Sequence, residues 1–393
     1  MRLLVSDSAA ASLERGHPWV YREALKKLPP QIGAGDVVDL NDSKGNFVGR
    51  GLFDPTSPIA VRIHHRDPHT PLDVDSFIRR IKAACALRTG RFDPADTNAY
   101  RLVNGEGDRI PGLVIDRYRD VAIVRLDGAS LDVWLERIEP KLAQFFGEIG
   151  IFSCAKRVMR DERDAASTRI TPLWGSTAPI RMFIRERGIA LEVDLHFGHK
   201  TGAFLDHREN LSLVRMLSKN RKRVLNLFSY TGGFSIAAAL GGAEHVTSID
   251  TAGPAHASAQ RSFRENGLDP SVHTFVTGDA FAFLDAAKVR GEVFDFVICD
   301  PPSFAPNEKS KPRALTSYKK LHRACAGVLS RGGVFCAASC SSHVSFDDFM
   351  GTLDDATLER TDLRVTHTLG QPTDHPWLPA WPEGRYLKLA VLE

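Results

Sequence analysis

The C-terminal half of the chain alternates short apolar runs with longer segments in which apolar residues recur at helical spacing. Short, wholly apolar runs are typical of strands that are buried on both faces. The predicted strands are Val224–Phe228, Val246–Asp250, Thr274–Thr277, Phe294–Cys299 and Gly333–Ala338. The predicted helices are Ser235–Leu240, Ala255–Asn266, Phe281–Val289 and Ser317–Leu329. This alternation predicts a mostly parallel sheet covered by helices, with a ligand site beyond the carboxyl ends of the strands.

The first 70 residues have a different pattern, in which short strands are separated by turn residues. The predicted strands are Asp36–Leu40, Phe47–Leu52 and Ile59–His64. Trp19 and Tyr21 flank Val20, so they share one face of a strand, and we expect that face to pack in the core. The pattern predicts a small β-rich domain over residues 1–70.

The middle of the chain mixes both patterns. The predicted helices are Ser76–Leu87 and Leu131–Phe146, and the predicted strands are Gly112–Asp116, Val121–Leu126 and Ile151–Arg157. We therefore expect an α+β domain over residues 71–188, followed by the α/β domain over residues 189–393.

Composition restricts the class of protein without identifying a partner. A hydrophobic content of 43% is typical of a folded globular chain, and a net charge of +3 does not by itself indicate nucleic-acid binding. The sequence has no apolar run of membrane-spanning length and no secretory signal, so a cytoplasmic protein is expected. The six cysteines are then expected to be reduced, and without a CxxC pair no zinc or other metal site is predicted.

Four features lie at successive strand ends of the α/β domain. Gly232 and Gly233 follow the first strand, where they permit a tight turn and close approach of a ligand. Asp250 ends the second strand and suits a ribose diol, and Asp279 follows the third, where it suits an adenine amino group. Asp300 opens an Asp-Pro-Pro after the fourth strand. A single carboxylate in such a place is more often a turn or cap residue, but the ordered series favours a nucleoside cofactor. The glycine loop is not GxGxxG, which argues against a dinucleotide and a dehydrogenase.

This series resembles the motifs of class I S-adenosylmethionine-dependent methyltransferases. More closely, the chain resembles the ribosomal RNA large-subunit methyltransferase I family, through the segments 198–208, 226–233, 300–304 and 339–341, with further likeness at 15–21, 105–108, 111–112 and 115–117. The resemblance implies an N-terminal PUA domain that binds RNA, a central α+β domain and a C-terminal Rossmann-like domain. It implies that S-adenosylmethionine is bound by Lys200, Thr201, Phe204, Phe228, Tyr230, Gly232, Gly233, Asp250, Asp279 and Asp300.

Two acceptor chemistries remain open. Carbon 5 of cytosine is a poor nucleophile until a thiolate adds to carbon 6, and the resemblance indicates Cys340 as that nucleophile. Alternatively, the Asp-Pro-Pro-Ser-Phe stretch resembles motifs of amino methyltransferases, in which Phe304 would stack on a base whose nitrogen is methylated. Cys340 favours the carbon acceptor, with a guanine nitrogen as the alternative. A third interpretation is a relative that binds RNA without catalysis. Such a protein would be expected to have lost a motif carboxylate or glycine, and here all of them are present.

The expected partner is ribosomal RNA whose target base is single-stranded or unstacked. Substrate contacts are expected from the residues around the Asp-Pro-Pro and from the basic run after it, namely Pro301, Pro302, Phe304, Lys309, Lys311 and Arg313. The alternative for the basic run is a solvated charged face. The base that removes the carbon 5 proton is not identified, and the sequence does not show whether the protein forms a homodimer.

Overall fold

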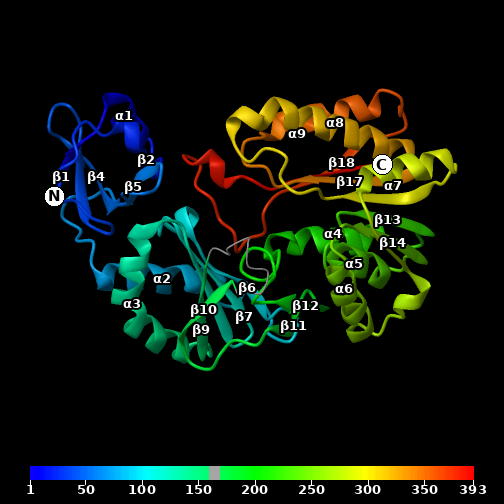
Figure 1. Ribbon diagram of the computed structural model, residues 1–393, viewed down its shortest axis with the longest axis horizontal. Coiled ribbons are helices and arrows are strands. Elements are labelled where there is room, and N and C mark those ends of the chain that lie inside the picture. The colour runs from blue at the N-terminus through cyan, green and yellow to red at the C-terminus, as the bar shows by residue number, and fades with distance from the viewer. Residues whose placement is uncertain (159–168) are drawn as a thin grey trace.

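Three β-sheets of five or more strands follow one another along the chain, and each lies in a different part of the molecule (Figure 1). The computed structural model describes residues 1–158 and 169–393. The described part confirms the expected fold class, with a β-rich N-terminal unit, a central α+β unit and a C-terminal α/β unit. None of its helices is both long and apolar enough to cross a membrane.

The N-terminal sheet has the order β1-β3-β4-β5-β2. Its strands are β1 (Arg2–Leu4), β2 (Trp19–Tyr21), β3 (Val37–Asn41), β4 (Phe47–Phe53) and β5 (Ile59–His65), and α1 (Asp7–Glu14) packs against it. The expectation for Trp19 and Tyr21 is wrong. The core residue of β2 is Val20, and since alternate side chains point to opposite faces, Trp19 and Tyr21 point away from the core.

The central sheet has the order β10-β9-β8-β7-β6. Its strands are β6 (Ala99–Asn104), β7 (Leu113–Tyr118), β8 (Val121–Leu126), β9 (Ser153–Arg157) and β10 (Ile170–Trp174). The helices α2 (Val74–Arg88) and α3 (Ala129–Glu148) bury their apolar faces against it. The hairpin of β11 (Arg181–Glu186) and β12 (Ile189–Asp194) follows, and the domain boundary expected at residue 188 falls in its turn.

The C-terminal sheet has the order β15-β14-β13-β16-β17-β19-β18. Its strands are β13 (Arg223–Leu227), β14 (His245–Asp250), β15 (Thr274–Thr277), β16 (Phe294–Cys299), β17 (Leu329–Ser339), β18 (Val365–Leu369) and β19 (Lys388–Leu392). Its helices are α4 (Arg208–Leu217), α5 (Gly233–Leu240), α6 (Gly253–Glu265), α7 (Ala280–Val289), α8 (Lys311–Gly327) and α9 (Phe346–Thr357). The five predicted strands are confirmed as a parallel set, and β19 joins them antiparallel. The strand order reverses between β13 and β16, which is where such sheets bind ligands.

The central strands of this sheet are apolar throughout because both of their faces are covered. Val224 and Phe296 belong to one core cluster, whereas their neighbours Leu225 and Val297 belong to another on the opposite face. Each strand therefore divides its residues between two helix layers. The short 3-10 helices lie in loops: Arg22–Ala24, Gly105–Asp108, Leu205–His207, Pro270–Val272, Glu308–Ser310 and Pro382–Gly384.

The connection between β18 and β19 leaves the C-terminal sheet and reaches the other two units (Figure 1). We call residues 370–387 the strap. The Asn104 side chain donates to the Pro376 carbonyl over 2.7 Å, which joins the strap to the central unit. The rings of Trp19 and Trp381 meet edge to face at 5.4 Å, which joins it to the N-terminal unit. One connection therefore contacts all three units.

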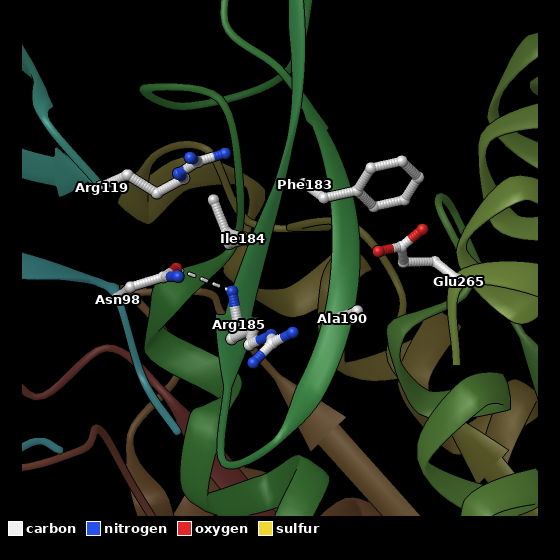
Figure 2. A pocket seen from close by; sticks show the side chains of 7 residues that line it. All are labelled: Asn98, Arg119, Phe183, Ile184, Arg185, Ala190 and Glu265. Atoms are coloured by element: carbon white, nitrogen blue, oxygen red, sulfur yellow. Dashed lines mark hydrogen bonds between the residues drawn. The ribbon is translucent and has the colours of Figure 1, made fainter. Parts of the chain in front are cut away.

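A pocket of about 280 Å³ opens where the β11–β12 hairpin meets α6 (Figure 2). It is lined by Asn98, Arg119, Phe183, Ile184, Arg185, Ala190 and Glu265. Glu265 ends α6, and a helix that follows a parallel strand runs back toward the amino edge of the sheet. The pocket therefore lies at the edge opposite the predicted site, and no predicted site residue lines it.

Candidate functional site

The loop between β13 and α5 presents backbone rather than side chains to the carboxyl edge of the sheet. Phe228, Tyr230 and Gly232 all have positive φ, of 59°, 46° and 80°. A Cβ atom on Gly232 would lie 2.8 Å from the Cβ of Ala259, so the turn requires glycine for space as well as for conformation. Helix α5 starts at Gly233 without a side-chain cap, which leaves the N–H groups of its first turn available to a ligand.

Two predicted carboxylates lie at neighbouring strand ends. Asp250 accepts hydrogen bonds from the backbone N–H groups of Tyr230 and Ala252, each over 2.8 Å, with one bond to each oxygen. Asp279 is exposed and caps α7 by accepting from the Ala282 N–H over 2.9 Å. Asp279 therefore does act as a helix cap, which was the alternative interpretation of this carboxylate. Because a carboxylate has about four acceptor positions, these bonds leave both groups able to accept from a ligand.

The loop before α4 carries a compact charged cluster. The Lys200 ammonium forms an ion pair with Asp206 and lies 4.5 Å from the centre of the Phe204 ring. The Tyr386 hydroxyl donates to the same Asp206 carboxylate over 2.6 Å. Burial alone would raise the pKa of Asp206, but the charges of Lys200 and His207 hold it well below its ordinary value. Asp206 is therefore ionised and fixes Lys200 at the sheet edge.

The same loop is held from the central unit. Thr201 donates to Asp116 over 2.6 Å, so the Tyr118 hydroxyl, 2.8 Å away, donates to Thr201. The Tyr118 oxygen in turn accepts from the Ala203 N–H over 3.1 Å. Arg101 forms a 2.8 Å ion pair with Asp116. Strand β7 therefore positions Thr201, a predicted cofactor residue, through three consecutive hydrogen bonds.

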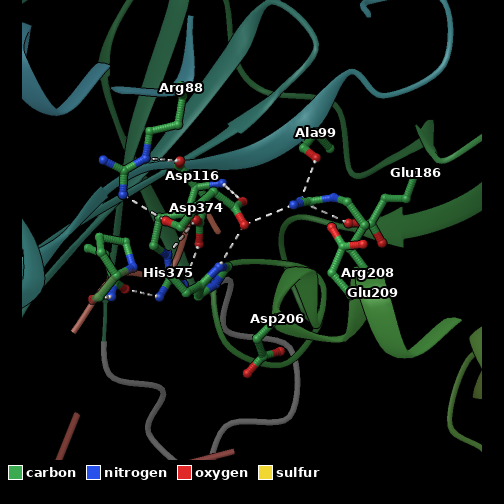
Figure 3. A network of polar contacts seen from close by, with 12 residues as sticks. Arg88, Ala99, Asp116, Glu186, Asp206, Arg208, Glu209, Asp374 and His375 are labelled. Atoms are coloured by element: carbon green, nitrogen blue, oxygen red, sulfur yellow. Dashed lines mark hydrogen bonds and ion pairs between the residues drawn. The ribbon is translucent and has the colours of Figure 1, made fainter. Parts of the chain in front are cut away.

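A buried ionic network joins α4, the central unit and the strap (Figure 3). The Arg208 guanidinium, which is fully buried, lies 2.8 Å from Asp374 and 3.2 Å from Glu186. Asp374 also accepts from the Arg101 N–H over 2.9 Å, and Arg88 donates to the Asp374 carbonyl over 2.7 Å. Burial would raise the pKa of Asp374, but His375 and Arg208 hold it below its ordinary value. The network fixes the strap against the start of α4 and against the central unit.

Cys340 lies directly after β17, beside the Asp-Pro-Pro. Its Sγ is 4.0 Å from the Pro301 carbonyl oxygen, and the side chain is half-buried. The other five cysteines, Cys85, Cys154, Cys299, Cys325 and Cys336, are buried. Burial and the nearby Asp300 carboxylate raise the pKa of Cys340 to about 11. Asp300 lies 3.3 Å from the His207 Nε2, and burial raises its own pKa.

The turn after Cys340 is tied down on both sides. Tyr318 on α8 contacts the hydroxyls of Ser339, over 2.9 Å, and Ser341, over 3.0 Å. The buried Lys388 donates to the Ser341 carbonyl over 2.7 Å and to the Val344 carbonyl over 2.6 Å. The position of Cys340 is therefore set by neighbours from α8 and β19.

The predicted substrate residues differ in exposure. Pro301 is buried and Pro302 is exposed. The Phe304 ring is half-buried, with its centre 4.9 Å from that of Tyr318. Packing therefore uses part of the Phe304 ring, and only the remaining part is open to a base.

The predicted basic run is only partly free to bind phosphate. Lys309, in the 3-10 helix before α8, and Arg313, in the first turn of α8, are both exposed. Lys311 forms a 2.7 Å ion pair with Asp348 on α9. An RNA phosphate would have to compete with this carboxylate for Lys311, whereas Lys309 and Arg313 require no such exchange.

Sequence reasoning did not select four residues that hold the site. Asp206 and His207 lie within the segment that carried the family resemblance, so their polarity next to Lys200 was an available signal. Tyr386 and Lys388 alternate along an apolar stretch near the end of the chain, and a lysine in such a stretch is a signal of a buried charge. Their partners, however, cannot be read from the sequence.

The arrangement fits the cofactor that the resemblance implies. The glycine turn gives a backbone cradle that a Cβ would fill, Asp250 and Asp279 keep acceptor capacity, and Asp300 lies at the reversal of strand order. These are the groups that a ribose, an adenine and a methionine amine require. In the described residues no group of three metal-ligating side chains is assembled, and none is needed for this fit.

Comparison with known proteins agrees with this geometry. Residues 156–383 match the S-adenosylmethionine-dependent methyltransferase family, and residues 3–66 match the PUA-like domain family. The chain is 33% identical over 389 residues to the ribosomal RNA large subunit methyltransferase I of Escherichia coli (strain SMS-3-5 / SECEC), covering 99% of this chain and 98% of that protein.

Solved structures are similar over the whole chain. The structure of a candidate methyltransferase complexed with SAH aligns with a TM-score of 0.87 at 26% identity. The alignment covers 100% of this chain and 99% of that chain. Another, of a candidate SAM-dependent methyltransferase from Streptococcus mutans, has a TM-score of 0.86 at 26% identity with the same coverage.

Proposed function

Because the chain belongs to the ribosomal RNA large subunit methyltransferase I family of S-adenosylmethionine-dependent methyltransferases, we propose that it methylates carbon 5 of a cytosine in large-subunit ribosomal RNA, with Cys340 as nucleophile. One observation carries the assignment of Cys340. It is half-buried at the carboxyl end of β17, with Sγ 4.0 Å from the Pro301 carbonyl, whereas the other five cysteines are buried. A thiol at this edge lies where the reversal of strand order brings ligands.

The covalent route follows from the chemistry of the base. The Cys340 thiolate forms a bond to carbon 6 of cytosine, which makes carbon 5 electron-rich. S-adenosylmethionine, when bound, supplies the electrophilic methyl group that carbon 5 takes up. A base then removes the carbon 5 proton, the bond between Sγ and carbon 6 breaks, and the double bond of the ring is restored. We assign no residue to that base.

The cofactor would be held by the predicted residues. The backbone of Phe228, Tyr230, Gly232 and Gly233 would line it, Asp250 would accept from the ribose, Asp279 from the adenine, and Asp300 from the methionine amine. Lys200, Thr201 and Phe204 would close the other side. The bonds from Asp116 and Tyr118 support this role for Thr201 because they fix its loop before the cofactor arrives.

The RNA would present an unstacked base, because carbon 5 must approach a thiol that is half-buried. Pro301, Pro302 and Phe304 would contact the base, and Lys309, Lys311 and Arg313 would contact phosphates. The PUA-like domain, joined to the strap through Trp19 and Trp381, would bind a neighbouring segment of the RNA. We place this reaction in the cytoplasm.

The test is methyl transfer from labelled cofactor to unmodified ribosomal RNA, with nucleoside analysis of the product. Wild type is expected to give 5-methylcytidine, and Cys340→Ala is expected to give none while binding SAH with unchanged affinity. Cys325→Ala is the matched control, because Cys325 is a buried cysteine away from the strand end. Full activity of Cys340→Ala would overturn the thiol mechanism, and a methylguanosine product would establish the nitrogen acceptor instead.

A further inference from the structure

We propose that Lys388 is a positioning residue for Cys340, which fixes the turn that follows the nucleophile and keeps a positive charge close to its thiolate. The inference rests on the proposed function, since it takes Cys340 as the nucleophile. Lys388 was not selected from the sequence.

The position of Lys388 is set by the sheet. It starts β19 and pairs with Ser339, the residue before Cys340, in the antiparallel ladder. Only 1% of its surface is exposed. Its ammonium donates to the carbonyls of Ser341 and Val344, so it closes residues 341–344 into a turn. Burying an ammonium group destabilises the fold unless the group is hydrogen-bonded. A functional role for the charge would explain why a lysine occupies this buried position.

The charges near Cys340 explain that use. Two carboxylates, Asp300 and Asp206, disfavour a thiolate at Cys340, and Lys200 favours it. The Lys200 charge is largely offset because Lys200 forms an ion pair with Asp206. Lys388 differs because its two hydrogen bonds are to neutral carbonyls, and among the described residues it forms no ion pair.

The pKa of Lys388 reflects the same surroundings. Burial lowers it to about 8, Cys340 and Asp348 oppose that decrease, and Arg385 adds to it. The ammonium form therefore prevails at neutral pH. Tyr318, which contacts Ser339 and Ser341, has its pKa raised to about 12 by burial and stays neutral there, so it contributes no charge.

The experiment measures the rate of Cys340 alkylation by iodoacetamide at pH 7 in the full chain, with the modified peptide quantified by mass spectrometry. Lys388→Met removes the charge and keeps a long apolar stem, and Lys388→Arg keeps the charge. Lys219→Met is the control, because Lys219 is exposed beyond the end of α4. SAH affinity is measured for each variant to establish that it is folded.

At pH 7, where the Lys388 ammonium prevails, we expect Cys340 of Lys388→Met to be alkylated roughly tenfold more slowly than in wild type, because loss of the charge raises the pKa of the thiol by about one unit. Lys388→Arg and Lys219→Met should stay within about threefold of the wild-type rate. Methyl transfer by Lys388→Met should fall in kcat, with an unchanged KM for S-adenosylmethionine.

An unchanged alkylation rate at pH 7 in a Lys388→Met variant that binds SAH like wild type overturns the proposal. If Lys388→Met does not bind SAH, Lys388→Arg decides, and a rate tenfold below wild type despite the retained charge overturns it. Failure of the proposed function gives a different result. Cys340→Ala would then keep its activity, whatever the alkylation rates show, and Lys388 would have no role in catalysis.

Discussion

Replacing Asp374 with alanine tests whether the buried network holds the molecule together. The Asp374 carboxylate is fully buried and accepts from Arg208 over 2.8 Å, from the Arg101 N–H over 2.9 Å and from His375 over 3.1 Å. The substitution leaves Arg208 with Glu186, 3.2 Å away, as its remaining carboxylate. It also leaves the Arg101 N–H without its acceptor.

The magnitude follows from the burial of these groups. Removing one partner of a buried ion pair costs about 3–5 kcal/mol, because the other charge stays buried without compensation. We take the lower end, about 3 kcal/mol, because Glu186 still faces Arg208. A unit of about 200 residues loses roughly 2–4 °C of Tm per kcal/mol, so the transition should fall by about 6–12 °C.

The assay measures the thermal unfolding of the full chain by calorimetry. Asp354→Ala on α9 is the matched control, because Asp354 is exposed and a surface substitution there should change the free energy of unfolding by less than about 0.5 kcal/mol. A Tm for Asp374→Ala within about 2 °C of wild type would refute the reasoning. It would mean that the network is not part of the unit that unfolds.

Two further predictions concern single side chains. Tyr118→Phe removes the hydroxyl that bonds Thr201 and Ala203, and a loss of about 1 kcal/mol should weaken SAH binding roughly fivefold by titration calorimetry. An unchanged Kd would show that the bonds do not position the loop. Burial lowers the pKa of His322 to about 4, so below its unfolded pKa only the unfolded state takes up the proton and stability is lost as the pH falls. Denaturant unfolding should show a loss of about 2 kcal/mol between about pH 7.5 and pH 5 that is absent in His322→Phe, and equal losses in both proteins would contradict it.

The parallel strands were predictable because burial on both faces leaves a continuous apolar run. Phe294–Cys299 was predicted to the residue, and it is a central strand. The antiparallel strands β18 and β19 were not predicted. Val365–Leu369 contains two threonines and a histidine and no buried residue, as expected of an edge strand, and Lys388 gives β19 a charged first residue.

The site was predictable where topology determines it and was missed where distant segments meet. Asp250 and Asp300 were selected because parallel strands bring their carboxyl ends to one edge. Asp374 and Tyr118 could not be selected in this way, because their partners Arg208 and Thr201 are far away in sequence, and Thr201 also lies in another unit than Tyr118. No local pattern encodes such pairs.

The strap limits how this protein can be recombined. A chimera that exchanges residues 1–66 as a cassette would leave Trp381 and Glu383 facing a foreign surface in place of Trp19 and His17. Because the strap continues into β19, a misfit there would be passed along the chain to Lys388. A graft of the PUA-like domain would therefore have to carry residues 370–387 with it, although more than 300 residues separate the two segments. The unit of exchange in this enzyme is defined by contact and not by continuity of sequence.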